Sequence, residues 1–390
     1  MIYDFDRPMD RRHSDSAKWC HFEEDVLPLW VADMDFLSPE PVLRALRERV
    51  DHGIFGYGGD PSELREVVVA RLETLYGWRV PSDALVFIPG VVTGFNLACR
   101  VVTAPGDGVL LQTPVYPPFL QAPANAGCRR DEMELTRRAD GRYDVDVELM
   151  EHTIAERTRV FILCNPHNPV GRVFTRSELQ RMAEVCLRHN LVICSDEIHC
   201  DLILQGHRHI PIASLSPEVE KRTITLMAPS KTYNVPGLHC SVAIIPDKGL
   251  RDKFKAAFAG LVGGVNVLGL VAALAAYRDG QEWLEQVLRY LEGNCDYLHQ
   301  SITQRMPVIH ASKPEGTYLA WLDCRGLGQV ISPCEFFLKQ GRVGLGEGAL
   351  FGRGGEGFVR LNFACRRATL EQALERMETA ILSSGRIGVS

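Results

Sequence analysis

The stretch MAPSKTYNVPGL, residues 227–238, places Lys231 among small and apolar neighbours, directly after the apolar run TITL. A lysine on a solvated surface normally lies among other charges, because its ammonium group stays in water. A lysine held in an apolar site loses basicity, and its neutral amine can then serve as a nucleophile or a base. Lys231 taken alone is more often a surface lysine, so its chemistry depends on its neighbours.

Four more side chains that could bind a ligand follow other apolar runs. Thr93 follows ALVFI, Tyr116 follows VLLQT, Asn168 follows VFILC and Asp196 follows LVICS. The carboxyl ends of parallel strands meet at one edge of a sheet, where open α/β proteins bind their ligands. We therefore expect these four side chains to lie along one rim together with Lys231.

Each residue also has a purely structural explanation. Asn168-Pro-Val-Gly could be a turn, and Asp196-Glu197 could cap a helix. The combination favours a functional site, because a single cofactor can require an amine, a carboxylate, an amide and an aromatic ring together.

The elements that must position these residues alternate along the chain. Six apolar runs are continuous, as is typical of strands buried on both faces of a mainly parallel sheet. Helical patterns lie between most of these runs, which predicts a doubly wound α/β domain over residues 45–275. The runs are ALVFIPG (84–90), GVLLQTP (108–114), RVFILCNP (159–166), LVICSDE (191–197), TITLMAPS (223–230) and CSVAIIP (240–246).

The sequence also predicts two helix starts, and its pattern of elements changes after residue 280. Asp60-Pro-Ser-Glu63 predicts an N-cap aspartate with proline at N1, and Thr175-Arg-Ser-Glu178 predicts a capping box. A long amphipathic helix then precedes the strand-like TYLAWLD and FVRLNFA and a last helix, LEQALERMETAIL. These elements predict a smaller α+β domain, made of residues 1–44 and 276–390.

The composition excludes some classes of partner. The chain has 390 residues and a net charge of −6, without a run of like charges, so we expect neither nucleic acid nor a membrane surface as a partner. Twelve cysteines lie scattered without a Cys-x-x-Cys pair, which is typical of a reducing, cytoplasmic compartment. The polar and acidic N-terminal stretch does not read as a signal peptide.

Residues 256–277 carry no charge over 22 positions, which is long enough to span a bilayer. The stretch contains four glycines and Asn266. A glycine-rich loop that leads into a packed helix, or an interface segment, is therefore the favoured interpretation.

The spacing of the motifs resembles a known family. NPHNPVG, SDEIH and SKTYNVPGL, with Asp196 28 residues after Asn168 and Lys231 another 35 residues on, resemble the fold-type I pyridoxal-phosphate enzymes of the aspartate-aminotransferase superfamily, class I/II. LWVADMDF (29–36), IFGYG (54–58) and VRLNFAC (359–365) resemble the MalY/PatB subfamily of cystathionine β-lyases and cystalysin-like C–S lyases. The resemblance covers about residues 28–370 and implies pyridoxal 5′-phosphate as the cofactor.

The resemblance assigns roles around the cofactor ring. Lys231 would bond to the cofactor aldehyde and then remove the substrate Cα proton. Asp196 would pair with the ring nitrogen, and Asn168 would donate to the ring 3′-oxygen. Tyr116 would stack on the ring, and His199 stands where aminotransferases use a tyrosine toward the same oxygen.

The resemblance also assigns the phosphate and the substrate. Val92 and Thr93, at a helix start, would bind the phosphate together with the Ser230 hydroxyl. Tyr57 would reach the phosphate of a neighbouring subunit, which implies a homodimer. Arg360 would hold the substrate α-carboxylate in bidentate fashion, and Asp33 would lie near the substrate mouth.

Three positions depart from the family pattern. His239 replaces a phosphate-binding arginine, and Ala228 replaces a hydroxyl residue, so the phosphate would depend on the helix start, Ser230 and Tyr57. Pro117 replaces a second tyrosine, so the handling of the leaving group is expected to differ.

The expected reaction is α,β-elimination of a sulfur-containing L-amino acid to a thiol, pyruvate and ammonia. An aminotransferase on the same scaffold is the main alternative. A regulatory protein that binds a partner through this fold is a less favoured one, and a Lys231→Ala variant that kept all biological activity would support it.

Two further patterns are expected to carry no function. Residues 352–357 fit G-x-G-x-x-G, but a strand-like run follows them where a dinucleotide site needs a helix, so a β-hairpin loop is predicted. His207 and His209 could be half of a metal site, but a polar loop is favoured and no metal is expected.

Overall fold

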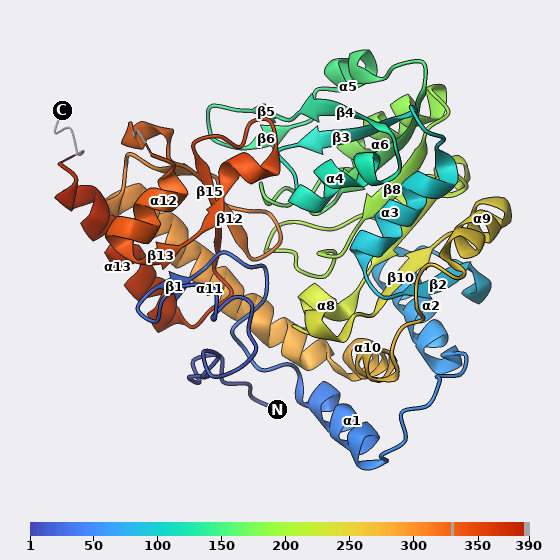
Figure 1. The fold of residues 1–390 in the computed structure, drawn as a ribbon, viewed down its shortest axis with the longest axis horizontal. Helices are drawn as coiled ribbons and strands as arrows, with labels where there is room; N and C mark the ends of the chain where they lie inside the picture. The colour runs from blue at the N-terminus through green and yellow to red at the C-terminus, as the bar shows by residue number, and fades with distance from the viewer. Residues whose placement is uncertain (329–330, 386–390) are drawn as a thin grey trace.

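The computed structural model describes residues 1–328 and 331–385, and a seven-stranded sheet lies at its centre (Figure 1). Its strands are β2 (Leu85–Ile88), β3 (Gly108–Thr113), β4 (Arg129–Glu134), β7 (Thr158–Cys164), β8 (Val192–Asp196), β9 (Thr223–Met227) and β10 (Ser241–Ile244). Their order is β2-β10-β9-β8-β7-β3-β4, and only β10 runs antiparallel to its neighbours. All six apolar runs are strands of this sheet, which confirms the mainly parallel α/β prediction.

Both faces of the sheet are covered, as the continuous apolar runs require. Val160 and Ile162 of β7 pack with α3, α4 and α9, whereas Phe161 and Leu163 pack with α5 and α6. The helices of this part are α1 (Glu40–Asp51), α2 (Ser62–Tyr76), α3 (Val91–Val102), α4 (Pro117–Asn125), α5 (Val147–Thr153), α6 (Arg176–Arg188), α7 (Pro217–Glu220), α8 (Pro229–Thr232), α9 (Lys248–Phe258) and α10 (Val267–Asp279).

Strand β4 is the element of this sheet that the sequence pattern did not indicate. Its residues, RRDEME, are mostly charged, and only Asp131 and Met133 are buried. The strand pairs with β3 and lies at the sheet edge. Charged side chains are typical of edge strands, because they discourage pairing with another chain.

A second, four-stranded sheet has the order β11-β12-β15-β14. The remaining elements are β11 (His310–Ala311), β12 (Leu319–Asp323), β14 (Gly346–Glu347), β15 (Phe358–Asn362), α11 (Gln281–Arg305), α12 (Pro333–Phe336), α13 (Arg367–Ser383), β1 (Leu27–Pro28), β13 (Val343–Gly344), β5 (Thr136–Arg137) and β6 (Tyr143–Asp144). The N-terminal segment joins the C-terminal part through parallel pairing of β1 with β13. The division into domains of residues 45–275 and of 1–44 with 276–390 stays a prediction.

The two predicted helix starts had different outcomes. The Thr175 hydroxyl accepts from the Glu178 amide at 3.3 Å, and the Thr175 amide donates to the Glu178 carboxylate at 2.7 Å, so the capping box is confirmed. The Asp60 prediction is wrong, because α2 begins at Ser62 after Pro61 and has no side-chain cap. Asp60 instead accepts from Arg65 Nε at 2.9 Å.

The uncharged stretch 256–277 is a loop followed by a packed helix, as predicted. Helix α9 ends at Phe258, and the Asn266 side chain caps α10 by accepting from the Gly269 amide at 2.8 Å. Within residues 1–328 and 331–385, no helix is long and apolar enough to cross a membrane. Residues 352–357 lie between β14 and β15, which pair antiparallel, so the predicted hairpin loop is also confirmed.

Candidate active site

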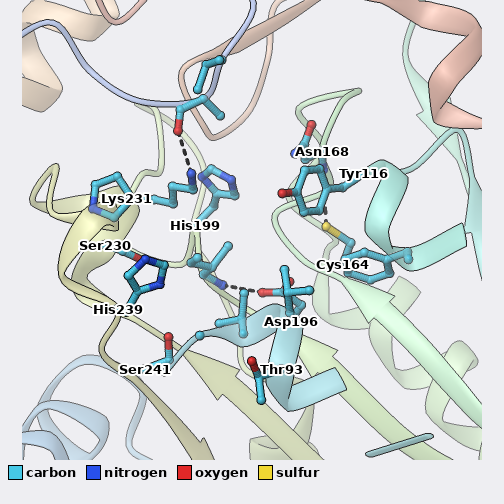
Figure 2. Close-up of a pocket in the computed structure, with 18 of the residues that line it drawn as sticks. Thr93, Tyr116, Cys164, Asn168, Asp196, His199, Ser230, Lys231, His239 and Ser241 are labelled. Atoms are coloured by element: carbon cyan, nitrogen blue, oxygen red, sulfur yellow. Dashed lines mark hydrogen bonds between the residues drawn. The ribbon is translucent and has the colours of Figure 1, made fainter. Parts of the chain in front are cut away.

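A cavity of about 550 Å³ opens where the parallel strands of the large sheet end (Figure 2). Helix starts, loops and a short N-terminal stretch surround it. Nine of the eleven predicted site residues line this cavity: Val92, Thr93, Tyr116, Asn168, Asp196, His199, Ser230, Lys231 and Arg360. The rim expected from the strand ends therefore exists.

Lys231 lies on α8, the short helix that follows β9. Its Nζ donates to the Ala32 carbonyl oxygen at 2.7 Å. Burial, assisted by the positive charge of Arg360, lowers the pKa of Lys231 to about 8, although Asp33 and Asp196 oppose this shift. An amine with this pKa is partly neutral near physiological pH, as a nucleophile or base requires.

Asp196 ends β8 and is 3% exposed. Its Oδ1 accepts from the Ile198 amide at 3.1 Å, and the described part of the chain offers the carboxylate no cation at hydrogen-bond distance. Burial, assisted by the negative charge of Glu197, raises the pKa of Asp196 to about 7, although the hydrogen bond from the Ile198 amide opposes this shift. A cationic group in the cavity would stabilise the ionised carboxylate.

Arg360 lies on β15 and is 7% exposed. Its Nη1 donates to Asn168 Oδ1 at 3.0 Å and its Nη2 to the Trp30 carbonyl at 2.8 Å, while its buried Nε has no partner. Burial lowers the pKa of Arg360 to about 10, so the side chain stays cationic at neutral pH. The described residues supply it no carboxylate, which suits binding of an anionic ligand.

The hydrogen bond from Arg360 Nη1 fixes the orientation of the Asn168 side-chain amide. A guanidinium group only donates hydrogen bonds, so the amide oxygen of Asn168 must face Arg360. The NH₂ group of Asn168 is then the part left to donate to a ligand. The Asn168 carbonyl also accepts from the Tyr116 amide at 3.0 Å, which holds the two residues side by side.

The start of α3 offers the hydrogen-bond donors that an anion site requires. The helix has 12 residues and no side-chain cap, so the amides of Val91, Val92 and Thr93 have no partner within the helix. The hydroxyl groups of Thr93, Ser230 and Ser241 lie near this end of the cavity (Figure 2). Backbone amides and hydroxyls of this kind commonly bind phosphate.

His199 and Tyr116 form other parts of the wall. Burial, assisted by the positive charges of Lys231 and Arg360, lowers the pKa of His199 to about 3. The imidazole is therefore neutral, and its Nδ1 has no partner. Burial raises the pKa of Tyr116, so its hydroxyl stays protonated.

Sequence reasoning missed several lining residues, among them Ser241, Cys164 and Trp30. Ser241 begins β10, and the start of an antiparallel strand lies at the edge where parallel strands end. The apolar run gave no sign of its direction. The only signal in the run CSVAIIP was the hydroxyl group of Ser241 itself.

Two predicted site residues do not line the cavity. Tyr57 is fully exposed in the segment between α1 and α2. Asp33 forms ion pairs with Arg11 at 2.7 Å and with Lys18 at 3.4 Å. Their functional roles stay predictions.

The two loop histidines also differ from one another. His207 is exposed, whereas His209 is buried with its Nε2 2.8 Å from Glu197 Oε2. Both histidines lie in a loop, as predicted, and the buried carboxylate of Glu197 partners His209.

The loop that carries Asn168 depends on Gly171. Gly171 has φ +72°, and an added Cβ would lie 2.5 Å from Pro314 Cβ. We expect Gly171→Ala to lower the free energy of unfolding by about 2–4 kcal/mol, from left-handed backbone strain and overpacking together. Gly77 has φ +67° with open space around it, so Gly77→Ala should cost about 1 kcal/mol. Urea unfolding of both variants measures the difference, and equal losses would contradict the overpacking.

The lining residues fit pyridoxal phosphate. An amine of lowered pKa, a buried carboxylate without a cationic partner and an uncapped helix start surround one cavity. These groups match an aldehyde, a pyridine nitrogen and a phosphate, respectively.

Comparison with known proteins gives a consistent set of relatives. The family model for aminotransferase class I and II matches residues 24–377. Cystathionine beta-lyase PatB of Bacillus subtilis is 41% identical, with 97% of this chain and 99% of PatB covered. Protein MalY of Escherichia coli is 32% identical over 97% of this chain and 99% of its own. The crystal structure of cystalysin from Treponema denticola, which contains a pyridoxal 5′-phosphate cofactor, superimposes with a TM-score of 0.95 at 33% identity, covering 98% of this chain and all of that one.

Proposed function

The chain belongs to the aminotransferase class I and II family, and we propose that it is a pyridoxal-phosphate-dependent carbon–sulfur β-lyase. The substrate is a sulfur-containing L-amino acid, which is converted with water to a thiol, pyruvate and ammonia. The observation that carries the proposal is the cavity shared by Lys231, Asp196 and Arg360, in a chain whose relatives PatB and cystalysin match it along nearly their whole lengths.

Different residues of the chain bind the substrate and accept its proton. Arg360 binds the substrate α-carboxylate through its free donor and its charge. Lys231 Nζ, as a neutral amine, accepts the proton from the substrate Cα. Bound pyridoxal phosphate supplies an electron-withdrawing ring that takes up the electron pair left at Cα.

Other residues hold the cofactor in place. Asp196 pairs with the ring nitrogen, Asn168 donates to the 3′-oxygen, and Tyr116 packs against the ring. The α3 amides at Val92 and Thr93 bind the phosphate with the hydroxyl of Ser230. His199 closes the wall as a neutral imidazole.

Incubation with L-cystathionine in the absence of a keto acid tests the activity. We expect release of pyruvate and a free thiol, because elimination needs no second substrate. An aminotransferase would instead need a keto-acid acceptor. Amino transfer that depends on an acceptor, without pyruvate release, would overturn the lyase proposal.

We further propose that the active unit is a homodimer, in which Tyr57 of one protomer approaches the cavity of its partner. Support comes from the exposed side chains of Ile54, Phe55 and Tyr57, since an exposed apolar cluster favours an interface. A monomeric mass in solution under active conditions would contradict this. We also place the enzyme in the cytoplasm, which cell fractionation tests.

A further inference from the structure

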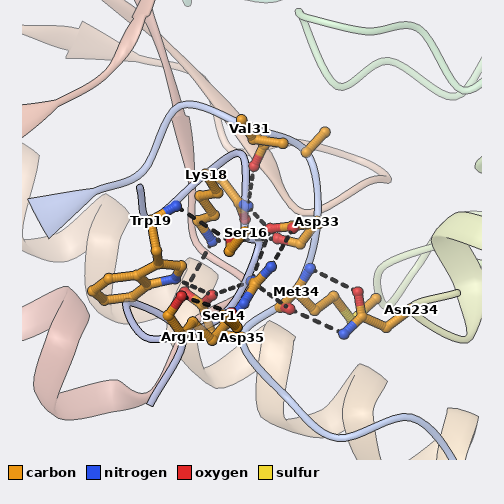
Figure 3. A network of polar contacts seen from close by, with 12 residues as sticks. Arg11, Ser14, Ser16, Lys18, Trp19, Val31, Asp33, Met34, Asp35 and Asn234 are labelled. Atoms are coloured by element: carbon orange, nitrogen blue, oxygen red, sulfur yellow. Dashed lines mark hydrogen bonds and ion pairs between the residues drawn. The ribbon is translucent and has the colours of Figure 1, made fainter. Parts of the chain in front are cut away.

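Residues 29–36, LWVADMDF, form an irregular segment that we call the strap. Its residues Trp30, Val31 and Ala32 line the cavity, and Figure 3 shows the polar contacts around it. Most of the strap lies outside any sheet, because β1 ends at Pro28. Its main-chain carbonyls must therefore find other donors. Side chains from two distant parts of the chain, residues 231–234 and 360–362, supply them.

Five successive carbonyls of the strap each accept a hydrogen bond from a side chain. Two of the donors, Arg360 and Lys231, belong to the cavity. The bonds are Arg360 Nη2 to Trp30 O (2.8 Å), Asn362 Nδ2 to Val31 O (2.6 Å), Lys231 Nζ to Ala32 O (2.7 Å), Asn362 Nδ2 to Asp33 O (2.6 Å) and Asn234 Nδ2 to Met34 O (3.0 Å). The strap thus presents one carbonyl to each functional cation of the site.

A cluster of charged side chains binds the two aspartates of the strap, Asp33 and Asp35. Arg11 bonds to Asp33 through both terminal nitrogens, at 2.7 and 3.2 Å, and to Asp35 at 2.6 Å. Lys18 is 1% exposed, with its Nζ 2.9 Å from Asp35 and 3.4 Å from Asp33. Asp35 also accepts from Trp19 Nε1 at 2.7 Å. Asp33 and Asp35 therefore share the same two cationic partners.

Ala32 lies between the two aspartates, Asp33 and Asp35, and the cavity. Its carbonyl accepts from Lys231 and, at 3.0 Å, from the Tyr318 hydroxyl. Asp33 is the next residue, so its ion pairs with Arg11 and Lys18 fix the backbone beside this carbonyl.

We propose that Asp33 is a positioning residue for Lys231: it fixes the Ala32 carbonyl as the acceptor for the Lys231 ammonium whenever that amine is free of the cofactor, and it places a negative charge beside that ammonium. The inference rests on the proposed role of Lys231 as the base. It assigns Asp33 to the lysine rather than to the substrate.

The charges around Lys231 support this role. The groups that act on it are Arg360 from β15, Asp196 from β8, Asp33 from the strap, and the neutral His199. Among the acidic groups that raise the pKa of Lys231, Asp33 has the larger effect and Asp196 the smaller. Asp35 is not among them, although it binds the same Arg11 and Lys18.

A comparison of Asp33→Asn with Asp35→Asn in the holoenzyme tests the proposal. The absorbance of the bound cofactor changes when the lysine-derived nitrogen titrates, so its pH midpoint reports the charge near Lys231 without any substrate. We expect Asp33→Asn to lower this midpoint by about 0.5–1 pH unit, because a nearby negative charge is lost. We also expect kcat to fall with little change in KM. Asp35→Asn should lower thermal stability similarly and leave the midpoint unchanged.

A third variant gives a change of opposite sign. Arg11→Gln removes the cation that offsets the charge of Asp33, so the pH midpoint of the cofactor absorbance should rise. Arg12→Gln is the control and should leave the midpoint unchanged. Arg12 bonds to the Trp19 and Val26 carbonyls and not to the strap. An unchanged midpoint in Asp33→Asn, or equal shifts in Asp33→Asn and Asp35→Asn, would overturn the proposal. The titration is independent of pyruvate release, so failure of the lyase proposal would be recognised separately.

Discussion

Lys231→Ala is expected to reduce kcat for pyruvate release by about 10³- to 10⁴-fold, the upper range for loss of a general base. The substitution removes the amine that bonds to the cofactor and accepts the Cα proton. The Ala32 carbonyl that accepts from Lys231 also accepts from Tyr318, so the variant should fold and still bind the cofactor without the covalent bond. Reduction with borohydride, followed by peptide mapping, should no longer fix the cofactor to residues 227–238.

A rescue experiment separates loss of the base from general damage. Added methylamine can occupy the space that the lysine side chain leaves, so it should partly restore pyruvate release in Lys231→Ala. The matched control is Lys248→Ala, which removes an exposed lysine of α9 and should retain full activity. If Lys231→Ala kept wild-type activity, the base would have to be another residue.

Asp196→Asn is the second substitution with a large expected effect. An amide keeps the size of the side chain but carries no charge to pair with the ring nitrogen. Breaking a buried charge pair costs about 3–5 kcal/mol, which corresponds to a fall in kcat/KM of about 10²- to 5 × 10³-fold. Steady-state assays at saturating cofactor measure it. Asp131→Asn is the control, because Asp131 is also buried and does not line the cavity, and the chemical change is the same.

The same residue predicts a pH dependence of cofactor binding. Burial raises the pKa of Asp196 to about 7 in the absence of the cofactor. Below that pH the free protein holds a protonated Asp196, which must lose its proton before it can pair with a cationic ring. Cofactor affinity should therefore fall about tenfold per pH unit below about 7. Dividing wild-type by Asp196→Asn affinities at each pH removes the titration of the cofactor itself, and a ratio that stays constant with pH would contradict the assignment.

Local patterns predicted much of this molecule. Strands β2, β7 and β9 could be recognised because each is a short apolar run between turn residues, and side chains at their carboxyl ends fell into one cavity. The Thr175 capping box could also be predicted from the sequence, because all its contacts lie within four residues. The sequence resemblance named the cofactor, which physical reasoning from the runs alone did not.

Features that depend on tertiary pairing could not be predicted in this way. Strand β4 carries no apolar run, and its position follows from pairing with β3. The direction of β10, which brings Ser241 to the rim, left no trace in the composition of its run. The partners of Asp33 come from residues 11 and 18, and neither charge pattern nor periodicity connects those positions to a strap.

The strap also sets the time at which the site can be completed during protein synthesis. Its Val31 and Asp33 carbonyls bind Asn362, at sequence separations of 331 and 329 residues. The ribosome must therefore release almost the whole chain before Asn362 can hold the carbonyls on either side of Ala32. Until then the strap lacks these contacts, so the large sheet can form first and the reactive centre is completed last.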